Sequence, residues 1–467
     1  MRLRILTNVL LVGLTLAACG GTAAPQSPPA SSSGASAPAS AGSSTAAAPA
    51  SAAAASPASQ AGGKTVEISL HYPQAGAGPL AKIIDGYAAE FSKANPDIKV
   101  TPVYDGDYPT TLAKVQQLVQ AGTPPDVAIV NSAAIYTMID SDIAIPLDDF
   151  IAKSGGDSLT KDFFPAFMAN SQQLGHVYSL PFQRSTLVMY YNKDAFKEAG
   201  ISDAPQSWQD VIADAQKLTK KDASGKVTRW GVGFPSSGTA YWEFQALAIE
   251  NGQNVFDNNS GNKVFFNSQA SVDGLQLLID LNKKYNVSPT GTVNWDTLPS
   301  DFAAGNYGIM FHTTGSLTNV LNSSKFEVGV GFMPKSKQFG TPTGGGGLYL
   351  VKGTSPERQA ASWKLIQFLT SPDRQAQWSI DSGYVASRIS AYDTPTLKDY
   401  VAKRPQALVA RDQLQYAQNE LGTHQMAQVQ QILSNAVQAG VTGQSDPKAA
   451  LDKAQQDTEK LLSQFKN

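Results

Sequence analysis

Apolar and polar positions in residues 66–130 follow first the period of a strand and then that of a helix. Every second residue from Val66 to Tyr72 is apolar, as in a half-buried strand. Residues 79–94 then carry apolar side chains at helical spacing, and Asn95-Pro96 ends the helix that they predict. A strand around residues 98–104, a helix through 112–119 and a strand at 126–130 follow in the same way. This order predicts a parallel α/β sheet.

The second half of the chain continues the alternation. Ser207 and Asp210 have the spacing of a helix N-terminal cap, with the hydroxyl first and the carboxylate three residues later. No internal sequence repeat is visible, so the pattern does not predict a solenoid. Further helices are predicted at residues 270–285, 355–369 and 448–465, and a buried strand at residues 307–311.

The N-terminus has the pattern of a bacterial lipoprotein signal. Arg2 and Arg4 precede an uncharged apolar run that ends at residue 18, and the run is shorter than the roughly 20 residues of a membrane span. Leu16-Ala-Ala-Cys19 has the form of a lipobox, in which the cysteine becomes the lipidated first residue. The alternative is an accidental cysteine. Cys19 is the only cysteine, so the chain cannot form an internal disulfide.

Residues 20–63 consist almost wholly of Ala, Ser, Pro, Gly and Thr and carry no charge. Such a segment has too little apolar surface to offset the entropy of ordering it. We therefore predict a flexible tether between Cys19 and the folded part. An O-glycosylated stalk is an alternative for the same composition.

Residues 181–200 carry the most specific local signal. The polar sequence Pro181-Phe-Gln-Arg-Ser-Thr predicts a short loop, and the apolar residues 187–191 predict a buried strand after it. A turn at residues 192–194 and a helix closed by Gly200 complete the segment, which contains Tyr-Tyr-Asn-Lys-Asp-Ala-Phe at 190–196.

This segment resembles the cluster 1 solute-binding proteins of ABC importers, and most closely their glycerol-3-phosphate-binding and sugar-binding members. The resemblance extends over nearly all of residues 65–467, with its pieces in the same order along the chain. The further matching pieces are Tyr104-Asp-Gly-Asp-Tyr108, Thr314-Gly-Ser-Leu317, the glycines at residues 344–347 ahead of Leu-Tyr, and Ser382-Gly-Tyr-Val385.

The resemblance implies an α/β, two-lobed periplasmic-binding-protein fold, similar to maltose-binding protein, with the ligand cleft between the lobes. It also implies hinge closure around a small polar solute and delivery to an ABC permease. The predicted divisions are a signal peptide at 1–18, the lipidated cysteine and tether at 19–63, an N-terminal lobe at 64–183 and 306–352, and a C-terminal lobe at 184–305 and 353–467.

A polar solute needs aromatic faces and converging hydrogen-bond donors. Asn131 and Ser132 follow the third predicted strand, at the edge where open α/β sheets usually bind ligands. Free N–H groups where a helix begins near Thr314 favour an anion or a sugar oxygen. The candidate ligand residues are Tyr108, Asn131, Ser132, Arg184, Ser185, Tyr241, Trp242, Thr314, Gly315, Ser316, Gly345 and Tyr384.

Six of these candidates also have a simpler structural explanation. Tyr108 fits a surface position, Arg184 a salt bridge between the lobes, and Thr314 a helix cap. Tyr241 and Trp242 fit core packing at the start of an apolar helix. The glycines around Gly345 fit a flexible crossing between the lobes.

Two departures from the glycerol-3-phosphate binders bear on the ligand. Those proteins have a carboxylate near the position of Asn131, and the local sequence here has none. They also have a ligand arginine near the C-terminus, where this chain has Gly422. A buried phosphate without a charged partner is costly, so a sugar or oligosaccharide is favoured. Glycerol-3-phosphate or a glycerophosphodiester is the alternative, with Arg184 as its partner.

The sequence gives no sign of catalysis, a cofactor or a metal site. The four histidines are scattered, and no zinc, nucleophile-elbow or phosphate-loop motif occurs. A net charge of −2 with scattered charges does not indicate nucleic-acid binding. We expect a monomeric, non-enzymatic receptor at the outer face of the membrane. A structural surface lipoprotein without a ligand is the competing class.

Overall fold

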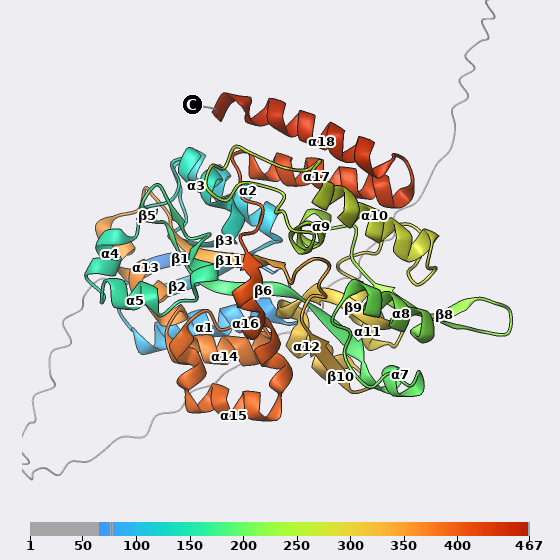
Figure 1. The fold of residues 1–467 in the computed structure, drawn as a ribbon. Helices are drawn as coiled ribbons and strands as arrows, with labels where there is room; N and C mark the ends of the chain where they lie inside the picture. The colour runs from blue at the N-terminus through green and yellow to red at the C-terminus, as the bar shows by residue number, and fades with distance from the viewer. Residues whose placement is uncertain (1–64, 75, 77, 466–467) are drawn as a thin grey trace, which may run out of the picture. The chain divides into compact units, whose positions relative to one another are not determined.

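The computed structural model describes residues 65–465, apart from residues 75 and 77 (Figure 1). The predicted signal peptide, the cysteine at position 19 and the tether lie outside the described residues and remain predictions. Within the described part, none of the helices combines the length and the apolar character that crossing a bilayer requires.

The strands of the described part alternate with helices as the sequence predicts. Their bounds are β1 (Val66–Pro73), β2 (Ile98–Gly106), β3 (Val127–Asn131), β4 (Gln172–Gln173), β5 (His176–Val177), β6 (Ser179–Asn192), β7 (Lys220–Lys221), β8 (Val227–Gly233), β9 (Tyr307–Thr313), β10 (Val328–Gly331), β11 (Thr341–Leu350) and β12 (Ala417–Gln418).

The α-helices range from single turns to long amphipathic helices. Their bounds are α1 (Leu80–Ala94), α2 (Tyr108–Gln120), α3 (Ile135–Asp140), α4 (Asp148–Ala152), α5 (Asp157–Lys161), α6 (Pro165–Met168), α7 (Lys193–Glu198), α8 (Trp208–Leu218), α9 (Ala240–Glu250), α10 (Gln269–Lys283), α11 (Leu298–Ala303), α12 (Leu317–Ser323), α13 (Pro356–Leu369), α14 (Pro372–Ser382), α15 (Pro395–Lys403), α16 (Val409–Gln413), α17 (Met426–Thr442) and α18 (Pro447–Leu462).

One sheet path runs through the protein in the order β2-β1-β3-β11-β6-β9-β8-β7, with β10 also paired to β6. The first three strands are parallel, as predicted. Strand β11 runs antiparallel to both β3 and β6, so the sheet is mixed. A sequence pattern that reports burial does not report strand direction, which explains this difference.

Strand β6 belongs to both halves of this path. Its first half, up to Thr186, pairs with β11, and its second half, from Leu187, pairs with β9 and β10. The loop predicted at residues 181–186 is therefore strand. The polar side chains from Gln183 to Thr186 misled the prediction, because they are buried where the strand passes from one half to the other.

Two lobes follow from this pairing. The first lobe contains β2, β1, β3, β11 and the first half of β6, and α13 and α14 contribute to its apolar core. The second lobe contains the second half of β6 with β9, β8, β7 and β10. In the second lobe α17 and α18 lie side by side, and both pack against α10 (Figure 1).

The lobe boundaries differ in part from those predicted. The prediction placed residues 306–352 in the N-terminal lobe and 353–467 in the C-terminal lobe. The hydrogen bonds instead put β9 with β8 in the second lobe, and α13 packs against β1 in the first. Local periodicity identifies a strand or a helix but not the sheet that it joins.

Local chemistry explains why the helices begin where they do. Ser207 and Asp210 form the predicted capping box of α8, with each side chain accepting a hydrogen bond from the other residue's backbone N–H. Asp107, the residue before Tyr108, is the N-terminal cap of α2. Its side chain accepts a hydrogen bond from the backbone N–H of Thr110 at 2.8 Å. The cap aligns the first turn of α2, which carries a candidate ligand residue.

Gly345 in β11 has φ +93° and sits against β6, where a Cβ atom would lie 1.7 Å from the carbonyl oxygen of Gln183. We predict that Gly345→Ala lowers the free energy of unfolding much more than Gly443→Ala. Gly443 also has positive φ but has open space around it, so its replacement should cost only about 1–2 kcal/mol. Urea unfolding of both variants measures the difference. Equal losses would contradict the close approach of β11 and β6.

Candidate functional site

A cavity of about 700 Å³ opens where β6 passes between the lobes. Residues from α2 and β3 of the first lobe line one side. Residues from α9, β9 and α17 of the second lobe line the other. Ser185 of β6 and the glycines Gly344 and Gly345 of β11 lie at the crossing itself. The cavity is thus built from both lobes and from the strands that join them.

The structure brings more than half of the predicted ligand residues together in this cavity. Those that line it are Tyr108, Asn131, Ser185, Tyr241, Trp242, Gly345 and Tyr384. Those that do not line it are Ser132, Arg184, Thr314, Gly315 and Ser316. Contact of the first group with a solute remains a prediction.

A carboxylate that sequence reasoning missed lies at the centre of the polar wall. The Oε1 atom of Glu420 accepts a hydrogen bond from Asn131 Nδ2 at 3.1 Å and another from the hydroxyl of Tyr241 at 2.8 Å. The expectation that no carboxylate lies near Asn131 is therefore wrong. Glu420 is far from Asn131 in the chain, and no local motif predicts that the two side chains lie together.

Glu420 is almost completely buried, with 2% of its surface exposed. Burial raises the pKa of its carboxyl to about 7, although the hydrogen bonds from Asn131 and Tyr241 and the charge of Arg184 act in the opposite direction. Its Oε2 atom is enclosed by the protein, and the nearby hydroxyl of Ser132 also acts to lower the pKa. Glu420 therefore lines the cavity with a nearly enclosed carboxyl group whose pKa lies near neutral pH.

Arg184 lies behind this wall and is fully buried. Its guanidinium carbon is 5.0 Å from the centre of the Phe167 ring, and its three side-chain nitrogens have no hydrogen-bond partner among the described residues. Burial lowers its pKa to about 10, and the nearby charge of Glu420 opposes that shift. In the described structure Arg184 neither lines the cavity nor forms a close ion pair, so it occupies neither of the two predicted positions directly.

Three rings form the aromatic wall of the second lobe. Trp242 and Trp295 meet edge to face with centroids 5.8 Å apart, and Trp295 stacks on His312 at 3.8 Å. The Trp242 indole N–H donates to the carbonyl of Thr343 at 2.9 Å, which holds it against β11. Burial lowers the pKa of His312 to about 3, so its imidazole is neutral at pH 7. Trp242 therefore packs into the wall and also faces the cavity.

The glycines of β11 and η2 allow the rings to approach. A Cβ atom at Gly344 would lie 2.5 Å from Trp242, and one at Gly346 would lie 3.0 Å from Tyr108. At Gly315, in the short helix η2 (Thr314–Ser316), a Cβ atom would lie 2.6 Å from Tyr384. Gly315 thus acts by letting Tyr384 reach the cavity and not by lining it.

The remaining predicted residues support the wall from behind. Thr313, not Thr314, caps the turn, because its hydroxyl oxygen accepts from the N–H of Gly315 at 3.1 Å. Thr314 accepts from the N–H of Thr186 in β6 at 3.4 Å. Ser316 pairs with His312 at 3.2 Å. Ser132 begins the turn η1 (Ser132–Ala134) after β3.

The charges on the cavity wall are all acidic. Asp107, Asp296 and Glu420 line it, and no lysine or arginine does so among the residues that the structure describes. The same part of the chain contains no cluster of three potential metal ligands. Asp296, Trp295 and His312 were not predicted, because single residues in loops and strands give no periodic signal.

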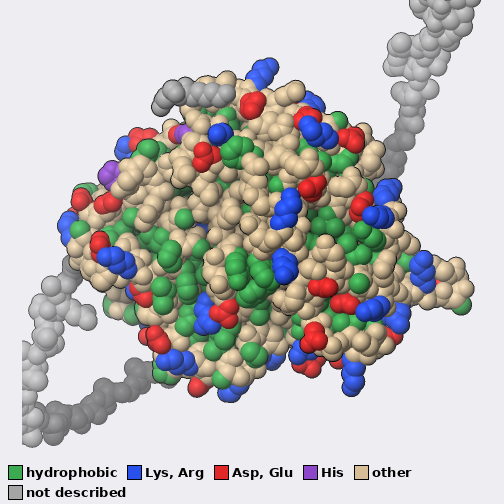
Figure 2. Space-filling view, viewed as in Figure 1, with side chains coloured by type: hydrophobic (Ala, Val, Ile, Leu, Met, Phe, Trp, Pro, Cys, Tyr) green, Lys and Arg blue, Asp and Glu red, His purple; other side chains and the backbone are tan. Residues whose placement is uncertain are grey.

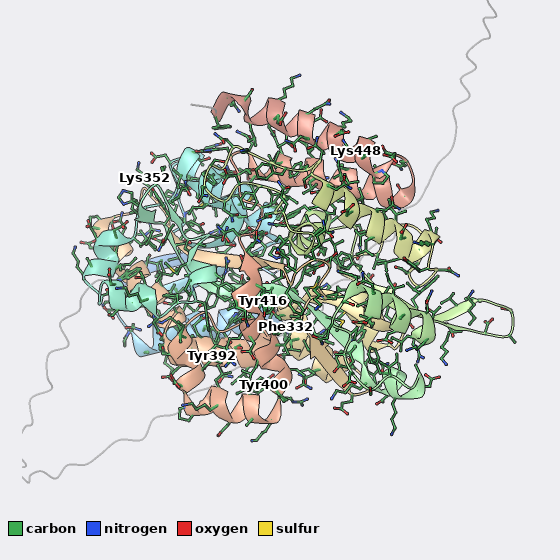
Figure 3. All side chains as sticks on the ribbon, in the orientation of Figure 1. Phe332, Lys352, Tyr392, Tyr400, Tyr416 and Lys448 are labelled. Atoms are coloured by element: carbon green, nitrogen blue, oxygen red, sulfur yellow. The ribbon has the colours of Figure 1, made fainter. Side chains whose placement is uncertain are left out.

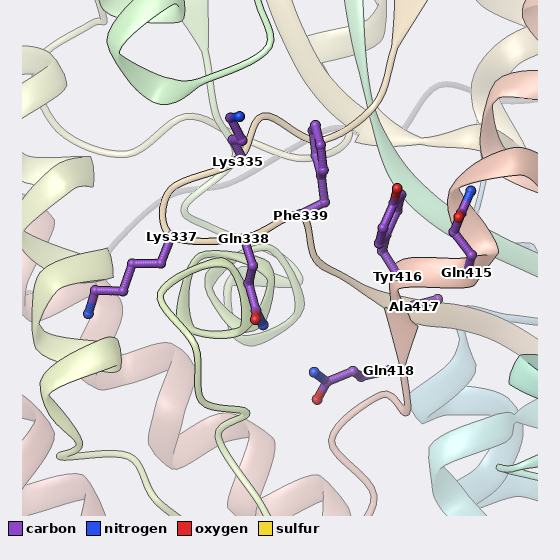
Figure 4. A pocket seen from close by; sticks show the side chains of 8 residues that line it. All are labelled: Lys335, Lys337, Gln338, Phe339, Gln415, Tyr416, Ala417 and Gln418. Atoms are coloured by element: carbon purple, nitrogen blue, oxygen red, sulfur yellow. The ribbon is translucent and has the colours of Figure 1, made fainter.

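A second hollow of about 530 Å³ lies outside the cavity, on the segments that lead into β11 and β12 (Figure 4). It is lined by Phe339 and Tyr416, whose ring centres are 5.3 Å apart, and by Lys335, whose ammonium nitrogen is 5.9 Å from the Phe339 ring centre. Tyr416 and its neighbour Phe332 are labelled in Figure 3, and Figure 2 shows the molecular surface from the same side. Its lining includes none of the buried polar atoms that lack a partner, so we place the candidate site in the cavity.

Comparison with known proteins agrees with this architecture. The family model of bacterial extracellular solute-binding proteins matches residues 86–405. The sn-glycerol-3-phosphate-binding periplasmic protein UgpB of Yersinia pseudotuberculosis is 30% identical over 404 residues, which cover 83% of this chain and 91% of that protein.

Two solved structures share the fold. UgpB from Mycobacterium tuberculosis in complex with glycerophosphocholine is similar with a TM-score of 0.75 and 23% identity, over 86% of this chain and 99% of that one. Maltose-bound MalE3 of T. maritima is similar with a TM-score of 0.74 and 23% identity, over 85% of this chain and 100% of that one. The predicted periplasmic-binding-protein fold is confirmed.

The chain belongs to the bacterial extracellular solute-binding protein family. It is a solute-binding protein of the kind that serves ABC importers, extracellular or periplasmic, and it is not an enzyme. The family assignment made from the sequence is confirmed.

The raised pKa of Glu420 predicts a pH dependence of stability. Between the ordinary value of 4.5 and the folded value of about 7, the folded state keeps a proton that the unfolded state releases. Stability therefore falls as the pH rises through this range, by about 3 kcal/mol from this group. Glu420→Gln keeps the acceptor oxygen without the charge, so it should remove this component. Urea unfolding at several pH values measures it.

The exposed Glu357 is the matched control, because Glu357→Gln changes the same atoms in water. Its stability curve should follow that of the unchanged protein. If Glu420→Gln also follows that curve, the carboxyl of Glu420 is not buried as described.

Proposed function

We propose that the protein captures an uncharged sugar or oligosaccharide in this cavity and delivers it to an ABC permease. The predicted lining residues and Glu420 would contact the solute. The observation that carries the proposal is the charge of the wall: its described lining includes the acidic Asp107, Asp296 and Glu420 but no lysine or arginine. A sugar has hydroxyl groups that donate to carboxylates and a C–H face that packs on indole rings.

The wall offers both kinds of contact within a short distance. The carboxyl group of Glu420, which is among the lining residues, would accept a hydrogen bond from a sugar hydroxyl. Trp242 and Trp295 offer aromatic surface on the same side of the cavity. A buried carboxylate that gains a hydrogen bond from the ligand loses part of its desolvation cost, which favours binding. The arrangement therefore suits a neutral polyhydroxylated ligand.

Hinge closure is the proposed mechanism. The solute would touch Tyr108 and Asn131 of the first lobe and Tyr241 and Trp242 of the second. A ligand that contacts both lobes binds the closed form more tightly than the open one, and this difference shifts the equilibrium. The permease would then recognise the closed form.

A glycerophosphodiester with a quaternary ammonium is the second candidate. One relative of known structure is complexed with glycerophosphocholine. A carboxylate beside Trp242 and Tyr241 has the composition of a quaternary ammonium site, because aromatic faces and a negative charge both attract that cation. Free glycerol-3-phosphate, the ligand in the name of the Yersinia relative, suits this wall less. Its dianion would face Asp107, Asp296 and the partly ionised Glu420, and no lysine or arginine among the described lining residues would offset their charge.

We test the ligand class by titration calorimetry and thermal unfolding with maltose, trehalose, xylo- and cello-oligosaccharides, glycerophosphocholine and glycerol-3-phosphate. A ligand at about 100 times its dissociation constant should stabilise the protein by roughly 2.7 kcal/mol. We expect stabilisation by at least one saccharide, and we expect Trp242→Ala to weaken that binding by about tenfold or more. The half-buried Trp230, which does not line the cavity, provides the control variant Trp230→Ala.

Binding of glycerophosphocholine alone would favour the second candidate. Binding of glycerol-3-phosphate alone would contradict the claim that the acidic wall excludes an anion. Arg184 would then be the candidate partner of the phosphate. A structural lipoprotein without a ligand would show no stabilisation by any of these solutes.

The proposal includes a lipid anchor on Cys19 and a tether at residues 20–63. A receptor that serves a membrane permease works best when it is held near it, and the lipobox sequence supports this role. We expect cells that express the protein to incorporate a labelled fatty acid into it, and we expect Cys19→Ser to abolish the label. Equal labelling of both forms would rule out Cys19 as the anchor.

A further inference from the structure

Two helices of different lobes present one face each to the outer part of the cavity. On α2 the lining residues are Pro109, Leu112, Ala113 and Gln116, which recur at helical spacing. Neighbouring positions such as Gln117 are exposed and do not line the cavity. One row of side chains on α2 therefore faces the cavity.

Helix α17 presents a matching row. Its lining residues Ala427, Gln430, Gln431 and Ser434 also recur at helical spacing, whereas the exposed Gln428 does not line the cavity. Each row covers about two helical turns, or about 10–12 Å. That length exceeds the width of one sugar ring.

The two rows start at the polar wall and lead away from it. At the start of α2, the hydroxyl of Tyr108 donates to Gln183 at 3.2 Å. Near the middle of α17, Ser434 accepts from the backbone N–H of Tyr241 at 3.3 Å. At the far ends, Gln116 is next to Ser141, and Met426 shares an apolar cluster with Leu112. Figure 1 shows α2 and α17 on the same part of the protein.

The chemistry of these rows differs from that of the polar wall. They carry amides and apolar side chains but no charged side chain. Gln430 donates through Nε2 to the carbonyl of Leu421 at 2.9 Å, which leaves its amide oxygen as an acceptor. Amides hydrogen-bond hydroxyl groups in either direction, and the small, exposed side chains of Ala113 and Ala427 leave room beside them for a sugar ring.

We propose that the lining rows of α2 and α17 form a second subsite, the helix arm, that takes the further units of an oligosaccharide. This inference rests on the proposed function. One sugar unit occupies the polar wall around Glu420 and Trp242, and the next units extend along the helix arm. The arm thereby sets the preferred chain length of the ligand.

The test compares ligands of increasing length on the full protein. The probes are glucose, maltose and maltotriose, and xylose, xylobiose and xylotriose, titrated by calorimetry. In one of these series, we expect the trisaccharide to bind at least about tenfold more tightly than the monosaccharide. Equal affinity along both series would overturn the helix arm while leaving saccharide binding intact.

Blocking variants locate the effect. Ala427→Phe on α17 and Ala113→Phe on α2 fill the arm without touching Glu420 or Trp242. Each should weaken trisaccharide binding by about tenfold or more and change monosaccharide binding by less than about twofold. The matched controls, Gln428→Phe and Gln117→Phe, add the same ring on exposed positions of the same helices that do not line the cavity. They should leave both affinities unchanged.

The outcomes separate the two proposals. If Ala427→Phe and Ala113→Phe weaken monosaccharide and trisaccharide equally, the arm is not a separate subsite. If they affect neither ligand, the further units do not follow α2 and α17. If no saccharide binds to the unchanged protein, the proposed function fails, and the helix arm fails with it.

Discussion

The continuity of β6 through both halves of the sheet is the constraint on which the rest of the structure depends. A single strand pairs with β11 in its first half and with β9 and β10 in its second. The polar side chains at its midpoint are buried because two lobes meet there, and the cavity opens at the same point. Strand β11 can follow β6 so closely only because Gly345 has no side chain. The site therefore lies at the crossing between the lobes, where β6 carries buried polar side chains beside the cavity.

The positions of the charged side chains then determine which ligands the cavity favours. Glu420 approaches the cavity, whereas Arg184 remains behind the wall, and each lowers the cost of burying the other. Moving a carboxylate and a guanidinium out of water is costly, so neither side chain is placed there for stability alone. Of this pair only Glu420 lines the cavity, and the described lining residues around it are neutral or acidic. A ligand that donates hydrogen bonds fits this pattern better than an anion.

Local patterns in the sequence predict much of the fold. The alternation from Val66 to Tyr72 and the capping box at Ser207 each identify an element that the structure contains. Strand β6 was predicted only in part, because buried polar residues such as Arg184 look like a loop in a sequence. The lobe to which β9 belongs depends on long-range pairing, and no residue in β9 encodes it locally.

The same distinction holds for the site. Tyr108 and Tyr384 were found through family motifs and do line the cavity. Glu420 was missed, because it meets Asn131 across 289 positions of the chain. The ligand argument from sequence used the missing arginine at Gly422. In the structure a Cβ atom at Gly422 would lie 3.0 Å from the Ala133 carbonyl oxygen, so this position supports the loop that carries Glu420.

The central claim is that an uncharged solute binds between Glu420 and Trp242. A crystal structure of the protein with its tightest-binding saccharide tests it most directly. The account predicts a sugar hydroxyl within about 2.7–3.2 Å of a Glu420 carboxylate oxygen, with the sugar ring against Trp242. A ligand bound elsewhere, or an anionic ligand held by Arg184 with Glu420 turned away, would contradict it.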